Sequence, residues 1–160
     1  MLYIVRHAWA EDAGEEYPDD KLRPLTKAGR KRFRKFVKQL AKRGFDPRHI
    51  ATSPLVRCRE TAEIIAANVP GEPQVAELEA LAPGSSLEPL IDWTRRQTGA
   101  DAAWVGHAPD VGMLAASLIG EPRLALHFAK GAVAAVEFDG EIAAGAGQLR
   151  WLITADILDC

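Results

Sequence analysis

Cysteine is scarce in this chain of 160 residues, where Cys58 and Cys160 are the two present. Two cysteines are too few for a disulfide framework, and they provide no paired spacing of the kind that holds a structural metal. The four histidines show no HxH or HxxxH spacing either, and His49 and His127 belong to no motif. Such sparing use of thiols is typical of a reducing compartment, so we expect a cytoplasmic protein.

Long hydrophobic runs are also missing. No apolar stretch reaches the length that a membrane span needs, and the chain does not open with a charged segment followed by an apolar one. The formal net charge is only −2, which argues against a general nucleic-acid binder. We therefore expect a soluble protein that binds neither membrane nor nucleic acid, and its length fits a single domain, residues 1–160.

The charges are unevenly distributed despite the small net value. Fourteen of the twenty Lys and Arg residues fall between Lys21 and Arg59, and six of the twenty-two acids lie between Glu11 and Asp20. Residues 27–43 carry apolar side chains at helical spacing with cations between them. This predicted basic helix is by default a solvated face. The alternative is a docking surface for an acidic partner protein, and the sequence leaves both open.

Glycine, proline and polar clusters divide the chain into alternating strands and helices. Strands are predicted at residues 2–5, 49–52, 75–78, 102–105, 132–138 and 148–154, and helices at about 27–43, 54–68, 86–97 and 109–119. This alternation is typical of a three-layer α/β/α sandwich with a mainly parallel central sheet. Residues 2–5 and 102–105 lack polar alternation, which favours central strands, and the last two strands are expected to form a hairpin at one edge.

Capping residues mark the predicted starts of the helices. Thr26 is expected to cap the first helix, and Ser53 with Pro54 to open the second. Ser85 and Glu88 have the spacing of a capping box for the third. Between the first strand and the first helix, the charged residues 11–25 cannot form a core and are predicted to be a loop.

Two of the predicted strands end in histidine. Residues 2–5 lead into Arg6-His7, and residues 102–105 lead through a glycine into His107. In open α/β sheets, ligands bind at the carboxyl ends of the strands, so two neighbouring parallel strands would direct both histidines into one crevice. Arg57 falls in the opening turn of a predicted helix, where free N–H groups already favour an anion. Together these side chains predict a positively charged pocket suited to a phosphoryl group.

These segments occur in the order found in a known family. The sequence resembles the histidine phosphatase superfamily, which contains the phosphoglycerate mutases and acid phosphatases, and within it the short SixA-type phosphohistidine phosphatases. The resemblance rests on four segments, which are the strand ending in Arg6-His7-Ala8, the second-arginine motif at residues 52–62, the second-histidine motif at residues 105–109, and the RPLTKAG segment at residues 23–29. It extends over essentially the whole chain and implies a phosphoglycerate mutase-like fold.

The resemblance also implies roles for individual residues. His7 would be the nucleophile that forms a phosphohistidine intermediate, and Arg6, Arg57 and His107 would bind the transferring oxygens. Arg23 would add a further contact to the substrate. No metal and no other cofactor is required by this chemistry. Because phosphoryl transfer spreads charge over three oxygens, positioning and electrostatic stabilisation are what the protein must supply.

The chain departs from the family pattern at two points. Ala8 replaces the glycine that follows the nucleophile, so the backbone there must accommodate a methyl group. A motif for the proton-donating glutamate of the larger members cannot be aligned. Four acids are possible substitutes, with Asp20 preferred because it lies three residues before Arg23: Glu11, Asp20, Glu77 and Glu79.

A missing proton donor favours a substrate with a phosphorus–nitrogen bond. A phosphorylated imidazole can be protonated on its own ring and depart as neutral histidine, whereas an alcohol needs a proton from the enzyme. The sequence therefore predicts a phosphatase acting on phosphohistidine in a signalling partner that carries a phosphotransfer domain, with phosphate as product. A general phosphomonoesterase and a non-catalytic phosphoryl-binding module are the alternatives. A metal-dependent hydrolase fits less well, because the two motif histidines lack an obvious third ligand.

Overall fold

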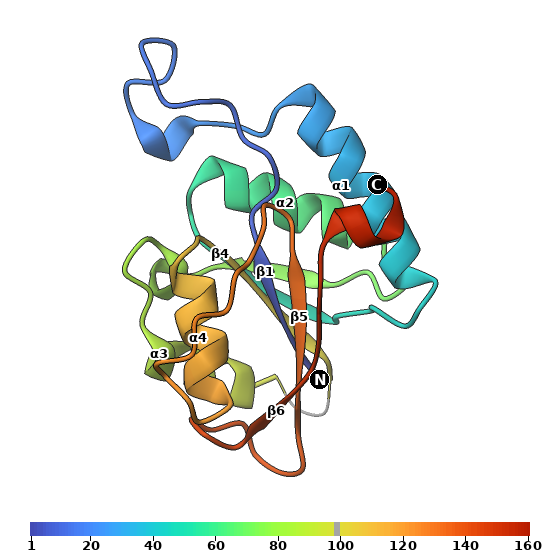
Figure 1. The fold of residues 1–160 in the computed structure, drawn as a ribbon, viewed down its shortest axis with the longest axis vertical. Helices are drawn as coiled ribbons and strands as arrows, with labels where there is room; N and C mark the ends of the chain where they lie inside the picture. The colour runs from blue at the N-terminus through green and yellow to red at the C-terminus, as the bar shows by residue number, and fades with distance from the viewer. Residues whose placement is uncertain (98–99) are drawn as a thin grey trace.

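A six-stranded sheet lies between two helical layers in the computed structural model, which describes residues 1–97 and 100–160 (Figure 1). The strands are β1 (Leu2–Arg6), β2 (His49–Thr52), β3 (Gln74–Glu77), β4 (Ala102–Gly106), β5 (Val133–Phe138) and β6 (Gly147–Ile153). The helices are α1 (Lys27–Ala41), α2 (Val56–Ala66), α3 (Leu87–Arg95) and α4 (Asp110–Leu118), with short 3-10 helices η1 (Asp20–Leu22), η2 (Glu79–Leu81) and η3 (Ala155–Leu158). The predicted α/β sandwich is confirmed.

The sheet has the strand order β3-β2-β4-β1-β5-β6. The first four of these strands are parallel, whereas β5 runs antiparallel to β1 and pairs with β6 in an antiparallel hairpin. The mainly parallel sheet, its central strands β1 and β4, and the hairpin at one edge are all as predicted. Within the described residues, no helix is both long and apolar enough to cross a membrane.

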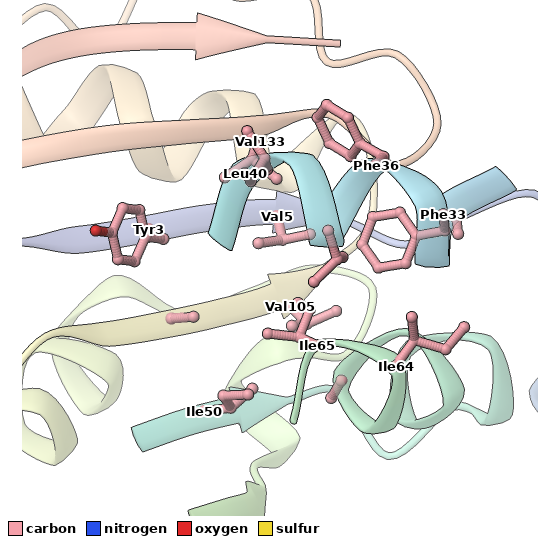
Figure 2. Packing of buried hydrophobic residues seen from close by; sticks show 14 of the residues in the cluster. Tyr3, Val5, Phe33, Phe36, Leu40, Ile50, Ile64, Ile65, Val105 and Val133 are labelled. Atoms are coloured by element: carbon pink, nitrogen blue, oxygen red, sulfur yellow. The ribbon is translucent and has the colours of Figure 1, made fainter. Parts of the chain in front are cut away.

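Alternate residues of the central strands point into two separate hydrophobic cores. On one face, Val5 and Val105 pack under Phe33 and Phe36 of α1 and the apolar side of α2, as Figure 2 shows. On the other face, Ile4 and Trp104 pack against α3 and α4. Because both faces are covered, β1 and β4 carry apolar residues at successive positions rather than alternating ones.

The basic helix is amphipathic, as its sequence predicts. Its apolar side is buried in the first core, and its cations lie on the other side. Part of that charge is neutralised within the molecule, because Arg30 forms an ion pair with Glu60, and Arg32 with Asp156 of η3. A docking role for the remaining cations stays a prediction.

Of the three predicted helix caps, one is confirmed and two are wrong. Thr26 caps α1 by accepting a hydrogen bond from the Gly29 amide. However, α2 begins at Val56 with Leu55 as its N-cap, two residues after the predicted Pro54. The Ser53 hydroxyl accepts a hydrogen bond from the Leu55 amide at 3.4 Å, before the helix begins, and lies 2.9 Å from the His107 ring.

The predicted capping box of Ser85 and Glu88 is also absent. Helix α3 starts at Leu87, and its N-cap is Ser86, which forms no side-chain cap bond. The Ser85 hydroxyl instead donates to the Ala82 carbonyl at 3.2 Å, within the preceding loop. Short polar side chains compete for local backbone partners in this way, so their spacing alone does not identify the cap.

Gly29 provides a test of how tightly the loop after β1 is held against α1. A Cβ at this position would lie 2.4 Å from the Trp9 carbonyl oxygen, which also accepts a hydrogen bond from the Thr26 amide. Alanine is favoured over glycine inside a helix by about 1 kcal/mol, but here a backbone atom must move. We expect Gly29→Ala to lower the free energy of unfolding by about 1–3 kcal/mol, measured by urea denaturation.

The matched control is Gly140→Ala, because a Cβ on Gly140 meets nothing within 4 Å. This change should alter stability by less than about 0.5 kcal/mol. A Gly29→Ala protein that is more stable than the parent would show that helix propensity outweighs the contact with Trp9.

Candidate active site

Backbone pairing brings the two motif histidines together. Arg6 pairs with Gly106 in the parallel register of β1 and β4, and the His7 amide donates to the Gly106 carbonyl at 3.0 Å. As a result, the rings of His7 and His107 lie 5.3 Å apart between centroids. The predicted meeting of both histidines at one sheet edge is confirmed.

The proton on the His7 ring is fixed by a backbone carbonyl. Nδ1 lies 2.8 Å from the Ala8 oxygen, and since a carbonyl can only accept, Nδ1 carries the hydrogen. The lone pair of the neutral ring is therefore on Nε2. Burial lowers the pKa of His7 to about 3, and the charges of nearby Arg57 and Arg6 act in the same direction. At neutral pH His7 thus has the protonation state of a nucleophile.

Ala8 accommodates its methyl group without backbone strain. The residue is fully buried and is not in the left-handed conformation that would require glycine. Its amide donates to the Thr61 hydroxyl at 3.0 Å, and that hydroxyl donates to the Arg57 carbonyl of α2. This chain of bonds ties the segment after His7 to the helix that carries Arg57.

Two arginines contribute buried N–H groups to the site. The Nη1 of Arg6 donates to the Phe128 carbonyl at 2.7 Å, and Arg57 donates through Nη1 and Nη2 to the backbone and carboxylate of Asp20, at 2.8 and 2.9 Å. In both side chains Nε is buried and has no hydrogen-bond partner within the described residues. Buried donors without partners are costly, and an anionic ligand held between the two guanidinium groups would remove that cost.

Asp20 is bonded to the arginines rather than directed at the histidines. Its Oδ1 accepts from Nε and Nη2 of Arg23, at 2.9 and 2.7 Å, while Oδ2 faces Arg57. Burial acts to raise the pKa of Asp20, but the hydrogen bonds from Arg23 and Arg57 outweigh it and lower that pKa overall. An ionised carboxylate is a poor proton donor, so this geometry suits a residue that positions Arg57.

His107 is held by Ser53 and lies against Cys58. Its Nε2 is 2.9 Å from the Ser53 hydroxyl and 3.4 Å from the Cys58 thiol. The serine hydroxyl can donate or accept, so the contact fixes the ring without fixing its proton. Burial, followed by the charge of Arg57, lowers the pKa of His107 to about 4. In the sequence, the one signal for the Ser53 contact is the place of this serine directly after β2.

These side chains surround a pocket of about 390 Å³. It is lined by Arg6, His7, Arg23, Arg57, Pro83, Gly84, His107, Ala108, Pro109, Asp110 and Lys130. Four of the charged lining residues are cationic and one is acidic. Such a pocket suits a phosphoryl group, whose oxygens match the planar guanidinium fork.

The other proposed proton donors lie away from this pocket. Within the described part of the chain, Glu11, Glu77 and Glu79 do not line it. Glu77 is 3.6 Å from Arg59, and Glu79 borders a neighbouring groove with Asp20. The sequence reasoning missed two charged lining residues, Asp110 and Lys130. The signal for Asp110 was its place three residues after His107, whereas Lys130 follows an irregular loop that carries no pattern.

The arrangement of possible ligand side chains among the described residues does not favour a metal site. Across residues 1–97 and 100–160, no group of three or more His, Cys, Asp or Glu side chains is arranged to hold a metal ion. His49 lies in β2, and His127 borders a second groove beside Arg6 and Pro109.

Comparison with known proteins identifies a family. A family profile described as the histidine phosphatase superfamily (branch 1) matches residues 2–82. The chain is 42% identical to an uncharacterised protein of Picosynechococcus over 115 residues, which are 69% of this chain and 68% of the relative. Three of the site residues predicted from the sequence, Arg6, His7 and Arg57, lie within the matched segment.

Solved structures share the fold over nearly the whole chain. The structure of the protein histidine phosphatase SixA complexed with tungstate has a TM-score of 0.84 and 25% identity, and covers 98% of each chain. The alpha-ribazole phosphatase from Shigella flexneri has a TM-score of 0.72 and 16% identity, and covers 96% of each chain. The second likeness is one of fold alone.

The lowered pKa values predict how stability depends on pH. An unfolded histidine has a pKa near 6.5, whereas His7 and His107 titrate at about 3 and 4 in the folded protein. Their contribution is complete above pH 6.5 and is lost as the pH falls from there through the folded values, because over this range the unfolded chain binds protons that the folded one does not. We expect His7→Gln to lessen this loss by up to about 1.4 kcal/mol per pH unit.

The measurement is urea unfolding at pH 7, 6 and 5, with the slope of stability against pH compared between the parent and the His7→Gln protein. Equal slopes would show that folding does not lower the pKa of His7.

A second prediction separates two roles for Asp20. If it positions Arg57, Asp20→Asn should reduce hydrolysis of all aryl phosphates by a similar factor, about tenfold for lost charged hydrogen bonds. If it donates a proton, the loss should grow as the leaving group worsens from nitrophenyl to phenyl phosphate. The control is Asp19→Asn, because Asp19 contacts the Lys21 amide instead of Arg57. We expect the uniform loss.

Proposed function

The chain belongs to the histidine phosphatase superfamily, a membership that supports phosphatase activity, and we propose that it hydrolyses phosphohistidine on a partner protein through a covalent intermediate on His7. The observation that carries this proposal is the state of His7. Its Nδ1–H is bonded to the Ala8 carbonyl, its Nε2 lone pair is available, and the pocket around it is mainly cationic.

In the first step, Nε2 of His7 attacks the phosphorus of the substrate. A bond forms between Nε2 and phosphorus, and the electron pair of the breaking bond returns to the leaving nitrogen. The Nδ1–H of His7 remains bonded to the Ala8 carbonyl, which stabilises the positive charge that the ring acquires. Arg6 and Arg57 face the phosphoryl oxygens, where they stabilise charge that the transition state spreads over three atoms.

In the second step, water attacks the same phosphorus and the bond to Nε2 breaks. The electron pair returns to Nε2, a proton from the water passes to solvent or to the departing phosphate, and His7 regains its neutral form. The charges of Arg57 and Arg6, which lower the pKa of His7, also favour this return by destabilising a cationic ring.

The protein substrate is supported by the chemistry of the pocket. A phosphorylated imidazole needs no proton from an enzymic acid if its ring is already protonated, and Asp20 is bonded to Arg23 and Arg57. The rim of the pocket is formed by exposed residues of two loops, including Pro83 and Pro109. A side chain projecting from another protein can enter such an opening. Similarity to the protein histidine phosphatase SixA favours the same substrate class.

A phosphomonoesterase is the second candidate. The pocket geometry that suits phosphohistidine also fits the phosphoryl group of an ester, and the fold is shared with an alpha-ribazole phosphatase. The two candidates differ in the leaving group rather than in the residues that hold the phosphate.

The substrate preference can be measured directly. We expect kcat/KM for a phosphohistidine-bearing phosphotransfer domain to exceed that for p-nitrophenyl phosphate and for phosphoglycerate, and the reverse order would favour the esterase. His7→Ala should abolish turnover of every substrate, whereas His49→Gln, outside the pocket, serves as the control. Rapid quench with labelled substrate should place phosphate on His7. Binding without labelling or turnover would point to a non-catalytic phosphoryl-binding module.

A further inference from the structure

The pocket has a buried floor and an exposed rim. His7, His107 and Arg57 form the floor, with 7%, 5% and 4% of their surface exposed. The rim is formed by exposed residues of the loop before α3 and of the segment that leads into α4, namely Pro83, Gly84, Ala108 and Pro109. The nucleophile is therefore at the bottom of the pocket, and a substrate must enter from the rim.

This arrangement determines where the leaving group lies. The attacking and leaving atoms are roughly in line through phosphorus during phosphoryl transfer. When Nε2 of His7 attacks from the floor, the leaving atom points outward, toward the rim. Charged residues at the rim consequently act on the leaving group, whereas those at the floor act on the phosphoryl oxygens.

Asp110 is the acidic side chain among the described lining residues. It is the first residue of α4 and is partly exposed. Its Oδ2 accepts a hydrogen bond from the Gly84 amide at 2.8 Å, which links the two loops of the rim. No described residue donates to the other carboxylate oxygen, Oδ1. This oxygen remains available to a substrate.

A carboxylate at this point opposes the main charge of the pocket. It repels a phosphoryl dianion, and it also repels a leaving group that departs as an anion. A substrate that carries a cationic donor beside the phosphoryl group avoids this cost and gains an attraction. Repulsion of unsuitable substrates is as effective a source of specificity as attraction of the right one.

We propose that Asp110 accepts a hydrogen bond from the protonated ring nitrogen of phosphohistidine and thereby selects a cationic imidazole leaving group over an anionic one. This inference rests on the proposed function and identifies its specificity-determining residue. In the transfer step the phosphorus–nitrogen bond of the substrate breaks, its electron pair neutralises the ring, and the proton stays on the other nitrogen facing Asp110. The ring departs as neutral imidazole.

Asp110 also holds the Gly84 loop, so its two roles must be separated. Gly84 has a positive φ of 87°, and the bond from its amide to Asp110 stabilises that turn. Asp110→Asn retains a side-chain oxygen that can accept this bond but removes the charge. Asp110→Ala removes both. The difference between the two variants measures the structural role, and the asparagine variant isolates the charge.

The experiment compares two small substrates with opposite leaving groups, phosphoimidazole and p-nitrophenyl phosphate, so that docking of a partner protein plays no part. We expect Asp110→Asn to lower the ratio of their kcat/KM values about tenfold, which is the effect of losing one hydrogen bond to a charged group. Glu88→Gln removes a carboxylate from the first turn of α3, outside the pocket, and should leave the ratio unchanged.

Two results would overturn the inference. One is an equal loss on both substrates in Asp110→Asn, which would leave Asp110 with only its structural role. The other is a wild-type protein that does not hydrolyse phosphoimidazole at all. If the ratio falls as expected but a phosphohistidine protein is not hydrolysed, the leaving-group preference stands and the proposed protein substrate fails.

Discussion

The site depends on the parallel pairing of β1 with β4. Five residue pairs, from Leu2 with Ala102 to Arg6 with Gly106, set the register of the two strands, and a backbone bond from the His7 amide to the Gly106 carbonyl continues it. The pairing lies in the middle of the sheet with apolar cores on both faces, so neither strand can slide without exposing buried side chains. The distance between the histidine rings is thus determined by the centre of the sheet rather than by the loops.

Assembling the site requires buried cations and neutral histidines to coexist. Arg57 is almost fully buried, and desolvation lowers the pKa of both His7 and His107. Asp20 compensates part of the positive charge by bonding Arg57 and Arg23 together from outside the pocket. The compensation is incomplete, since the Nε groups of Arg6 and Arg57 have no partner in the described structure. A phosphoryl group held between the two guanidinium groups would offset this remaining charge.

The sequence was most informative where its signal was regular or belonged to a motif. The apolar runs of β1 and β4 predicted central strands, and the side chains that follow them predicted the meeting of His7 and His107. It was least informative where a short polar residue had several possible partners. Ser53 resembled a helix cap but contacts His107, and Ser85 bonds its own loop. Asp20 was preferred as an acid from its spacing to Arg23, yet Arg23 itself donates the hydrogen bonds that keep Asp20 ionised, together with Arg57, 37 residues away.

The position of Asp110 at the rim suits the modest stabilisation of the protonated substrate ring from which the proposed transfer step benefits. The reactive form of phosphohistidine has a protonated ring, and a nearby carboxylate increases the fraction of substrate in that form. Once the ring is fully protonated, stronger binding of the cation only stabilises the ground state and no longer accelerates transfer. A deeply buried carboxylate would bind the cationic ring more strongly than is useful for transfer, and it would also repel the phosphoryl oxygens. A partly exposed carboxylate, already accepting a bond from Gly84, provides a modest interaction.

The same reasoning applies to His7, whose partner is a neutral carbonyl, that of Ala8. In the proposed mechanism, a carboxylate there would stabilise the phosphorylated ring of the intermediate and slow its hydrolysis.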